Sequence, residues 1–315
     1  MISHPEKVLF PKDGITKAEL AGYYEAVAPV MLPHIRQRPV TMERFPSGIG
    51  QHGFLQKDVA KAANRGPDWL ERVEVPKRGG VVNHPLVNDA RSLLWMANQN
   101  CITLHVWPSR VPNLYQPDLC VFDLDPSQDD ADVLCSAALA VRDLLHELDL
   151  PSWVKTSGSK GFHIVVPIEP DLPFDEVAAF ASSAAAILVQ RHSSTLTLEF
   201  SKAERGGRIY VDVGRNGYSA TFAAAYSVRP KAGAPVSAPC RWDEIETAWS
   251  DRARSPSIRW LGDSRRLAIC GPTWLPAHAP CEVRSIDSNR WLVAERCSLM
   301  PVGTTEAVHT LKTRT

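Results

Sequence analysis

Two aspartates, one residue apart at the end of an apolar segment, are the first candidates for chemistry in this sequence. Asp123 and Asp125 alternate with Phe122 and Leu124 in the segment CVFDLDP, residues 120–126. Alternate side chains of a strand point to the same face, so we expect the carboxylates to project together while the apolar residues face the core. Two ionised carboxylates this close repel each other unless a cation lies between them. For an isolated D-x-D pair, however, a helix cap or a surface pair is the simpler interpretation.

A third aspartate makes a metal site the better interpretation. In the segment RIYVDVG, Asp212 lies on the strand face opposite Ile209 and Val211. A carboxylate within so apolar a strand requires a cation or a donor. Three carboxylates favour Mg²⁺ or Mn²⁺ over zinc. Two such ions would leave surplus positive charge able to hold a triphosphate, as in two-metal phosphoryl and nucleotidyl transfer.

The segment VKTSGSKGFHIVVPI has the pattern of a β-hairpin whose turn could bind phosphate. Its two glycines let backbone N–H groups approach an anion, Ser157 offers a hydroxyl and Lys160 offers a charge. His163 follows on the second strand and could donate to a phosphate or a ribose. A plain hairpin with a polar tip is the alternative, and the nearby carboxylates favour the phosphate site.

The elements that must position these residues alternate between strands and helices. Thr16 and Glu19 form a capping-box pattern at the start of an amphipathic helix, and residues 32–60 are expected to form loops and short strands. The alternation predicts an α/β or α+β domain. The predicted helices cover residues 14–27, 90–100, 131–148 and 174–191, and the predicted strands cover residues 102–107, 120–124, 152–157, 162–168, 208–213 and 219–228.

The composition excludes several classes of protein. The formal net charge of the 315 residues is zero, although residues 201–235 are locally basic. The seven cysteines include no C-x-x-C pair, so we expect neither a disulfide framework nor a structural zinc site, and a reducing cytoplasm fits best. The most apolar helical segment is too short and too rich in alanine to span a bilayer, so we expect no membrane association. Residues 266–315 lack a clear period and are predicted to form a C-terminal extension.

Several segments together resemble one family. The segments VFDLDP, KTSGSKGFHIVVPI and IYVDVGRN are similar to motifs of the polymerase domain of bacterial ligase D, a member of the archaeo-eukaryotic primase superfamily that acts in non-homologous end joining. The resemblance extends in order from residue 4 to about residue 246 through HPEKVLFPKDGITKAEL, RPVTMERFPSGIGQHGFLQKD, LHVWPSR and GAPVSAPCRWDEIE. It implies a primase-like α+β fold of mixed and antiparallel sheets flanked by helices, with the catalytic domain over residues 1–265.

The resemblance also implies roles for individual residues. Two Mn²⁺ or Mg²⁺ ions would be held by Asp123, Asp125 and Asp212. The incoming nucleoside triphosphate would be bound by His105, Ser157, Lys160, His163, Arg205 and Arg229. DNA would be bound by Lys7 and Lys17 at a downstream 5′-phosphate, by Phe54 through stacking on template bases, and by Arg44 and Lys57 nearby. Outside this pattern, Lys7 and Lys17 would be ordinary surface lysines, and Phe54 would be a core residue.

The activity implied is addition of ribo- or deoxynucleotides to DNA 3′-ends and filling of short gaps, with ribonucleotides preferred and Mn²⁺ as a strong cofactor. The chain departs from the family at Leu55, where a second stacking aromatic is usual, and at Ala225, where proline is usual. No K-x-D-G ligase motif occurs, so we expect a stand-alone polymerase. We also expect it to be monomeric, cytoplasmic and nucleoid-associated. It would act on 5′-phosphorylated ends and gaps with an ATP-dependent DNA ligase in trans and Ku.

Two alternatives stay open at this point. VFDLDP also resembles the first motif of haloacid-dehalogenase-type phosphatases, and LGDSRR at residues 261–266 imitates their last acidic motif. Those enzymes usually continue with Gly-Thr where this chain has Pro126 and Ser127, and Asp212 would be unexplained. A non-catalytic module that binds DNA ends is the second alternative; it would need the basic residues but not the three carboxylates.

Overall fold

The computed structural model describes residues 2–61 and 65–247 of the chain. The predicted extension, residues 266–315, and the LGDSRR segment lie outside the described residues. Within the described residues, no helix is both long and apolar enough to cross a membrane.

The larger sheet carries the three aspartates. Its six strands lie in the order β11-β12-β8-β10-β9-β14; β11 and β12 are parallel and the other neighbours are antiparallel, so the sheet is mixed. The bounds in that order are Leu196–Thr197, Ile209–Asp212, Leu119–Asp125, Phe162–Pro167, Trp153–Thr156 and Pro239–Cys240. Helices α3 (Ala131–Glu147) and α4 (Phe174–Arg191) cover one face, where Phe122, Leu124 and Val211 are buried in a common core.

The smaller sheet is antiparallel and has the strand order β13-β7-β3-β4. Its bounds in that order are Phe222–Ala223, Cys101–Val106, Val40–Arg44 and Phe54–Gln56. Helices α1 (Lys17–Ile35) and α2 (Ala90–Asn98) pack with it around a second core. Two short pairs complete the α+β fold: β1 (Val8–Phe10) with β2 (Ile15–Thr16), and β5 (Arg72–Lys77) with β6 (Gly80–Pro85).

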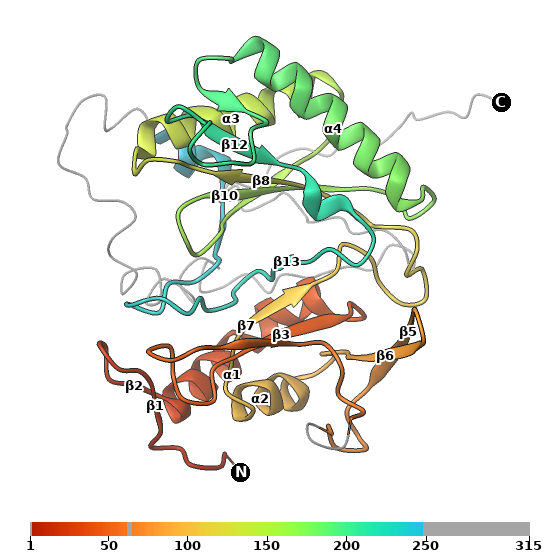
Figure 1. Cartoon of the computed structure of the whole chain (residues 1–315), viewed down its shortest axis with the longest axis vertical. Coiled ribbons are helices and arrows are strands. Elements are labelled where there is room, and N and C mark those ends of the chain that lie inside the picture. Colours follow the sequence, from red (N-terminus) through yellow and green to blue (C-terminus); the bar gives the residue numbers. More distant parts are fainter. Residues whose placement is uncertain (1, 62–64, 248–315) are drawn as a thin grey trace, which may run out of the picture. The chain divides into compact units, whose positions relative to one another are not determined.

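The two sheets turn their inner faces toward each other, each with its helices on the outside (Figure 1). The ring of His163 on β10 contacts the ring of Phe222 on β13, with centroids 5.9 Å apart. The polar faces of β8, β10 and β12 therefore look toward the smaller sheet and away from α3 and α4. This arrangement keeps the aspartates apart from the two apolar cores.

Most predicted elements are confirmed. Thr16 and Glu19 form the capping box of α1, Asp130 caps α3, and β9 and β10 form the predicted hairpin. The prediction of loops over residues 32–60 was wrong for the first four residues, because α1 continues to Ile35. Two prolines lie inside this helix, but burial of its apolar side chains on the smaller sheet compensates for the lost backbone hydrogen bonds.

The strand predicted over residues 219–228 was also wrong in length. Only Phe222–Ala223 pairs as a strand, against β7. Tyr226 has a φ of 64°, and this left-handed conformation ends an extended segment. Most apolar residues of this segment are buried, but they do not form a continuous strand.

Candidate active site

The candidate active site is built on two neighbouring strands. Asp212 on β12 lies directly opposite Asp123 on β8, and Asp125 is two residues further along β8 on the same face. One oxygen from each of the three carboxylates can be chosen so that all lie within 4.8 Å of one another. The alternation of apolar and acidic residues produces this arrangement, because Phe122, Leu124 and Val211 occupy the helix-covered face.

The donors of this site fit a divalent cation. Asp123 is only 5 % exposed, and its Oδ1 makes no hydrogen bond within the described residues, although His163 Nε2 faces it at 3.4 Å. A buried carboxylate oxygen without a donor is costly unless a ligand satisfies it. Three carboxylates with no histidine or cysteine among them suit Mg²⁺ or Mn²⁺.

Arg215 bridges two of the carboxylates and was not among the predicted site residues. Its Nε donates to Asp123 Oδ2 at 3.1 Å, and its NH2 group lies 3.2 Å from Asp212 Oδ2. The short helix η2 (Gly214–Asn216) turns the chain back toward β8 and brings the guanidinium to this position. The only signal in the sequence was its place in the basic segment, three residues after Asp212.

The environment gives two of the aspartates opposite pKa shifts. Burial alone would raise the pKa of Asp123, but the neighbouring His163 and Arg215 outweigh it and hold this pKa at about 2. Burial and the charges of Asp123 and Asp212 raise the pKa of Asp125 to about 6, although Arg215 and Arg205 oppose this. Ionisation of Asp125 therefore costs more than ionisation of Asp123 in the absence of a cation.

Two buried basic groups lie beneath the carboxylates. His163 is opposite Asp123 in the pairing of β10 with β8, and its Nε2 lies 3.4 Å from Asp123 Oδ1. Lys155 on β9 is 5 % exposed, and its Nζ lies 2.7 Å from His163 Nδ1. Burial lowers the pKa of Lys155 to about 7 and, together with the charge of Lys155, lowers the pKa of His163 to about 4. Lys155 was missed because a lysine in a short strand is most often a surface residue.

The predicted phosphate-binding turn is packed directly on the metal-site strand. The Oγ of Ser157 accepts hydrogen bonds from the N–H groups of Ser159 at 3.2 Å and Gly161 at 3.1 Å. A Cβ on Gly161 would lie 1.8 Å from the Leu124 carbonyl oxygen, so only glycine fits there. Lys160 is exposed at the tip, where its Nζ lies 4.0 Å from an Asp129 oxygen.

The predicted arginines occupy different environments. Arg229 is beside the turn: a Cβ on Gly158 would lie 2.5 Å from Arg229 Cγ, and the Arg229 Nε is buried with no partner among the described residues. Arg205 is 4 % exposed and donates to the carbonyls of Glu199 and Phe200. Its NH1 also lies 3.4 Å from the Asp125 carbonyl oxygen, so Arg205 fastens its own loop to β8.

His105 lies on the smaller sheet rather than with the carboxylates. Its Nε2 is 3.1 Å from Glu43 Oε2 on the neighbouring strand β3. Burial lowers the pKa of His105, although the Glu43 carboxylate opposes the shift. The charge of Arg229 lowers the pKa of both His105 and Glu43. Because Arg229 lies beside the hairpin turn, these two residues are also close to that turn.

The two lysines predicted at a 5′-phosphate differ in burial. Lys7 is half-buried, whereas Lys17 is 3 % exposed, so the alternative of two surface lysines was wrong for Lys17. The Nζ of Lys17 donates to the carbonyl of Ser3 at 2.8 Å. Burial lowers the pKa of Lys17, and the charges of Lys7 and Arg44 lower it further. Three cationic side chains thus converge at the start of α1.

The predicted stacking residue is a surface residue and not part of the core. Phe54 is 43 % exposed and Leu55 is 61 % exposed. The guanidinium of Arg44 lies 5.4 Å from the centroid of the Phe54 ring and is fixed by hydrogen bonds to Gln56 and to the Gln99 carbonyl. Lys57 is exposed at the end of the same strand. The core alternative for Phe54 was therefore wrong.

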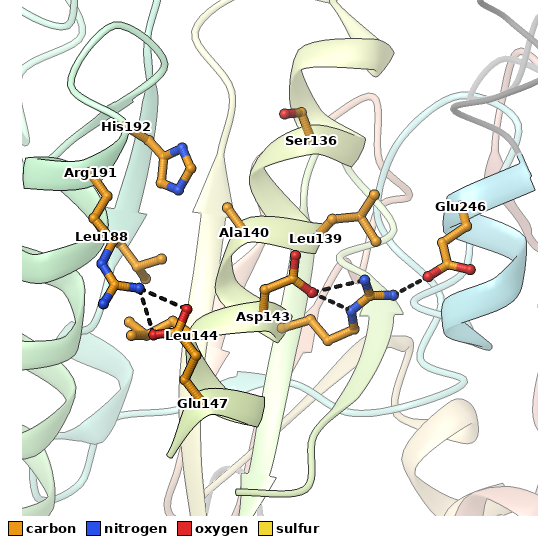
Figure 2. A pocket seen from close by; sticks show the side chains of 11 residues that line it. Ser136, Leu139, Ala140, Asp143, Leu144, Glu147, Leu188, Arg191, His192 and Glu246 are labelled. Atoms are coloured by element: carbon orange, nitrogen blue, oxygen red, sulfur yellow. Dashed lines mark hydrogen bonds and ion pairs between the residues drawn. The ribbon is translucent and has the colours of Figure 1, made fainter. Parts of the chain in front are cut away.

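A hollow of about 550 Å³ lies elsewhere, on the outer side of the larger sheet, where side chains of α3 and α4 line it (Figure 2). Its charged side chains are already paired, with Arg142 on Asp143 and Glu246, and Arg191 on Glu147. The carboxylates of the metal site are on the opposite face of the sheet. This hollow therefore takes no part in the candidate active site.

The fold and the three carboxylates define an α+β protein with a centre suited to divalent cations. Residues 16–259 match the family described as LigD, primase-polymerase domain, and this match covers most of the chain. The chain belongs to this family. Family membership and fold together reject the phosphatase alternative.

The chain is similar to known LigD proteins over most of its own length. It is 36 % identical to the multifunctional non-homologous end joining protein LigD of Mycolicibacterium smegmatis over 247 residues, which are 78 % of this chain and 32 % of that protein. It is 34 % identical to the Pseudomonas aeruginosa protein of the same name over 249 residues, 78 % of this chain and 29 % of that one. The chain thus spans about a third of the length of these relatives.

A solved structure shares the fold. The polymerase domain of Mycobacterium tuberculosis ligase D in complex with DNA superposes with a TM-score of 0.75 at 34 % identity. The superposition covers 89 % of this chain and 99 % of that chain. The α+β fold with mixed and antiparallel sheets, expected from the sequence, is thereby confirmed.

Proposed function

We propose that the chain is a DNA-repair polymerase that adds nucleotides to DNA 3′-ends and fills short gaps at double-strand breaks. The observation that carries the proposal is the partly buried cluster of Asp123, Asp125 and Asp212 on adjacent strands of a LigD primase-polymerase fold. A module that only bound DNA ends would have no use for three carboxylates that repel one another. We assign the catalytic domain to residues 1–265.

The chain's own residues would divide the work around the reacting phosphate. Asp123, Asp125 and Asp212 would hold two Mn²⁺ or Mg²⁺ ions, which lower the pKa of an attacking 3′-hydroxyl and stabilise the leaving pyrophosphate. The aspartates fix the position of the reacting groups because they sit on sheet strands rather than on loops. Water is excluded on one side by the apolar core beneath β8.

The nucleotide would lie against the hairpin turn. The exposed Lys160 ammonium and the Arg229 Nε, which makes no hydrogen bond within the described residues, place positive charge beside the turn. Ser157 and His163 complete this side, and His105 would approach from the smaller sheet. Arg205 would contribute indirectly, by donating hydrogen bonds to the carbonyls of Glu199 and Phe200 and so fixing this loop. This role is less direct than the nucleotide contact inferred from the sequence.

DNA would be bound at the other sheet. Lys7 and Lys17 would contact a downstream 5′-phosphate, and Phe54, with Arg44 and Lys57 beside it, would stack on template bases. The DNA complex of the mycobacterial domain supports this assignment at the level of the fold. Ribonucleotide preference, Mn²⁺ as the favoured ion, a ligase acting in trans, recruitment by Ku and a monomeric state are further parts of the proposal.

A primer-extension assay tests the proposal. The substrate is a short-gapped DNA with a 5′-phosphate, incubated with Mn²⁺ and either ATP or its deoxy counterpart. We expect extension by the unmodified chain and by Asp171→Ala, an exposed aspartate outside the site, and none by Asp125→Ala. DNA binding without extension by any of the three folded proteins would support the end-binding module instead.

A further inference from the structure

Lys155 is a buried lysine with unusual hydrogen-bond partners, and it is neither a metal ligand nor a nucleotide-binding residue in the proposed function. Its Nζ lies 2.7 Å from His163 Nδ1 and 2.5 Å from Ser237 Oγ, and it faces the Phe222 ring at 5.7 Å from the centroid. Within residues 2–61 and 65–247, no carboxylate lies within ion-pair distance of this ammonium. A buried lysine that is paired with an imidazole instead of an acid is unusual, because burial of an amine normally requires a carboxylate.

The direction of each hydrogen bond follows from its partners. Ser237 Oγ donates to the carbonyl of Thr156 at 2.8 Å, so it accepts from Lys155 Nζ. Lys155 therefore has a proton left for His163 Nδ1, which must then carry a lone pair. On its other side the imidazole faces Asp123 Oδ1, an acceptor 3.4 Å from Nε2.

When Lys155 carries its charge, only one form of the imidazole satisfies both neighbours. The neutral Nε2–H tautomer accepts from Lys155 and turns its proton toward Asp123 Oδ1, which at 3.4 Å makes no hydrogen bond with it in this structure. The Nδ1–H tautomer would place a donor against the lysine and a lone pair against the carboxylate. The doubly protonated ring would likewise lose the bond from Lys155.

We propose that Lys155 is a positioning residue that locks His163 in the Nε2–H tautomer and, through it, orients the Asp123 carboxylate for cation binding. The proposal rests on the proposed function only in treating Asp123 as a metal ligand. His163 is one step removed from the metal ligand, and removal of such a partner typically changes metal affinity about 10- to 100-fold. Lys155 acts one step further out, through His163, so we expect the lower end of this range.

The test compares the unmodified chain with Lys155→Met, which retains the side-chain length and removes the donor. The ring nitrogens of His163 are observed in ¹⁵N-histidine-labelled protein, with His163→Gln used for assignment. We expect a single Nε2–H tautomer in the unmodified chain and a mixture or the Nδ1–H form in Lys155→Met. An Nδ1–H ring in the unmodified chain, or the same tautomer in both proteins, would overturn the proposal.

The second readout is Mn²⁺ affinity measured by electron paramagnetic resonance. We expect the dissociation constant to rise roughly tenfold in Lys155→Met, with no loss of thermal stability, because a methionine removes a buried amine. Loss of a positive charge alone would tighten Mn²⁺ binding, so unchanged or tighter binding contradicts the proposal. Lys77→Met, on the exposed strand β5, is the matched control and should change neither readout.

Ser237→Ala gives an independent variant in case Lys155→Met does not fold. It removes the hydroxyl that fixes the lysine and leaves the lysine itself. We expect the same direction of change in tautomer and affinity, to a smaller extent, and an unaltered tautomer would again count against the proposal. The tautomer measurement needs neither nucleotide nor polymerase activity, so its failure is distinguishable from failure of the proposed function.

Discussion

Asp212 lies directly opposite Asp123 in the antiparallel pairing of β12 with β8. Such a pair of like charges would normally destabilise a sheet. Here Arg215 spans the two carboxylates at 3.1 and 3.2 Å and supplies the countercharge in the absence of metal. The same guanidinium must compete with any cation that binds these oxygens.

We therefore predict that Arg215→Gln tightens Mn²⁺ binding. Repulsion between a guanidinium and a divalent ion is on the order of 1–2 kcal/mol in water-like surroundings, so the dissociation constant should fall roughly tenfold. The metal-free protein should melt at a lower temperature, since the carboxylates lose their countercharge. Isothermal titration and thermal melting check both effects. Arg191→Gln, which breaks an exposed ion pair on α4, should leave Mn²⁺ affinity unchanged; weaker binding by Arg215→Gln would contradict the competition.

Asp125→Asn should stabilise the metal-free protein while it weakens cation binding. The pKa of Asp125 is raised from 3.8 to about 6, so the folded state binds the extra proton and stability falls as the pH rises from 3.8 to 6. Asparagine removes this penalty, with an expected gain of about 1 kcal/mol above pH 6 after solvent screening. The gain should disappear near pH 4. Urea unfolding at pH 4 and pH 7 measures the difference in the free energy of unfolding between Asp125→Asn and the unmodified chain. The same difference at both pH values would exclude the electrostatic cause.

Phe54→Ala should weaken binding of single-stranded template without unfolding the protein. Stacking of one base contributes about 1–3 kcal/mol, so we expect roughly tenfold weaker binding by fluorescence anisotropy. The melting temperature should change little, because the ring is 43 % exposed. Leu55→Phe is the reciprocal change and should strengthen binding, since it adds a second aromatic beside the first. A template affinity that neither variant alters would remove Phe54 from the DNA-binding surface.

Lys7→Ala and Lys17→Met should both reduce the preference for gaps with a 5′-phosphate over gaps with a 5′-hydroxyl. Burial and the charges of Lys7 and Arg44 lower the pKa of Lys17, and a bound phosphate would relieve that repulsion. Deprotonation of Lys17 removes a charge, so the preference should decline as the pH rises toward this lowered pKa. Competition binding with the two DNAs provides the measurement, with Lys77→Ala as control. The idea fails if removal of the 5′-phosphate leaves binding and gap filling unchanged.

Local pattern predicted much of the site. The alternation in CVFDLDP was enough to place Asp123 and Asp125 on one face, and the glycines of the hairpin predicted its turn. Arg215 and Lys155 were not predicted, because their positions depend on how η2 reverses the chain and on which strand pairs with β10. The burial of Lys17 depends on residues near Ser3 that fold back over it, which no periodicity of α1 reveals.

The fit of Gly161 against Leu124 has a further consequence. Because a Cβ there would lie 1.8 Å from the Leu124 carbonyl, the turn and the metal-site strand can hardly move independently. Binding of a triphosphate at the turn should therefore change the affinity of the metal site for a cation. By reciprocity, whatever factor a bound triphosphate adds to cation affinity, the cation must add to triphosphate affinity. A larger residue at this position would force the turn and β8 apart, so the contact that links the two sites cannot be changed without moving the strand that carries Asp123 and Asp125.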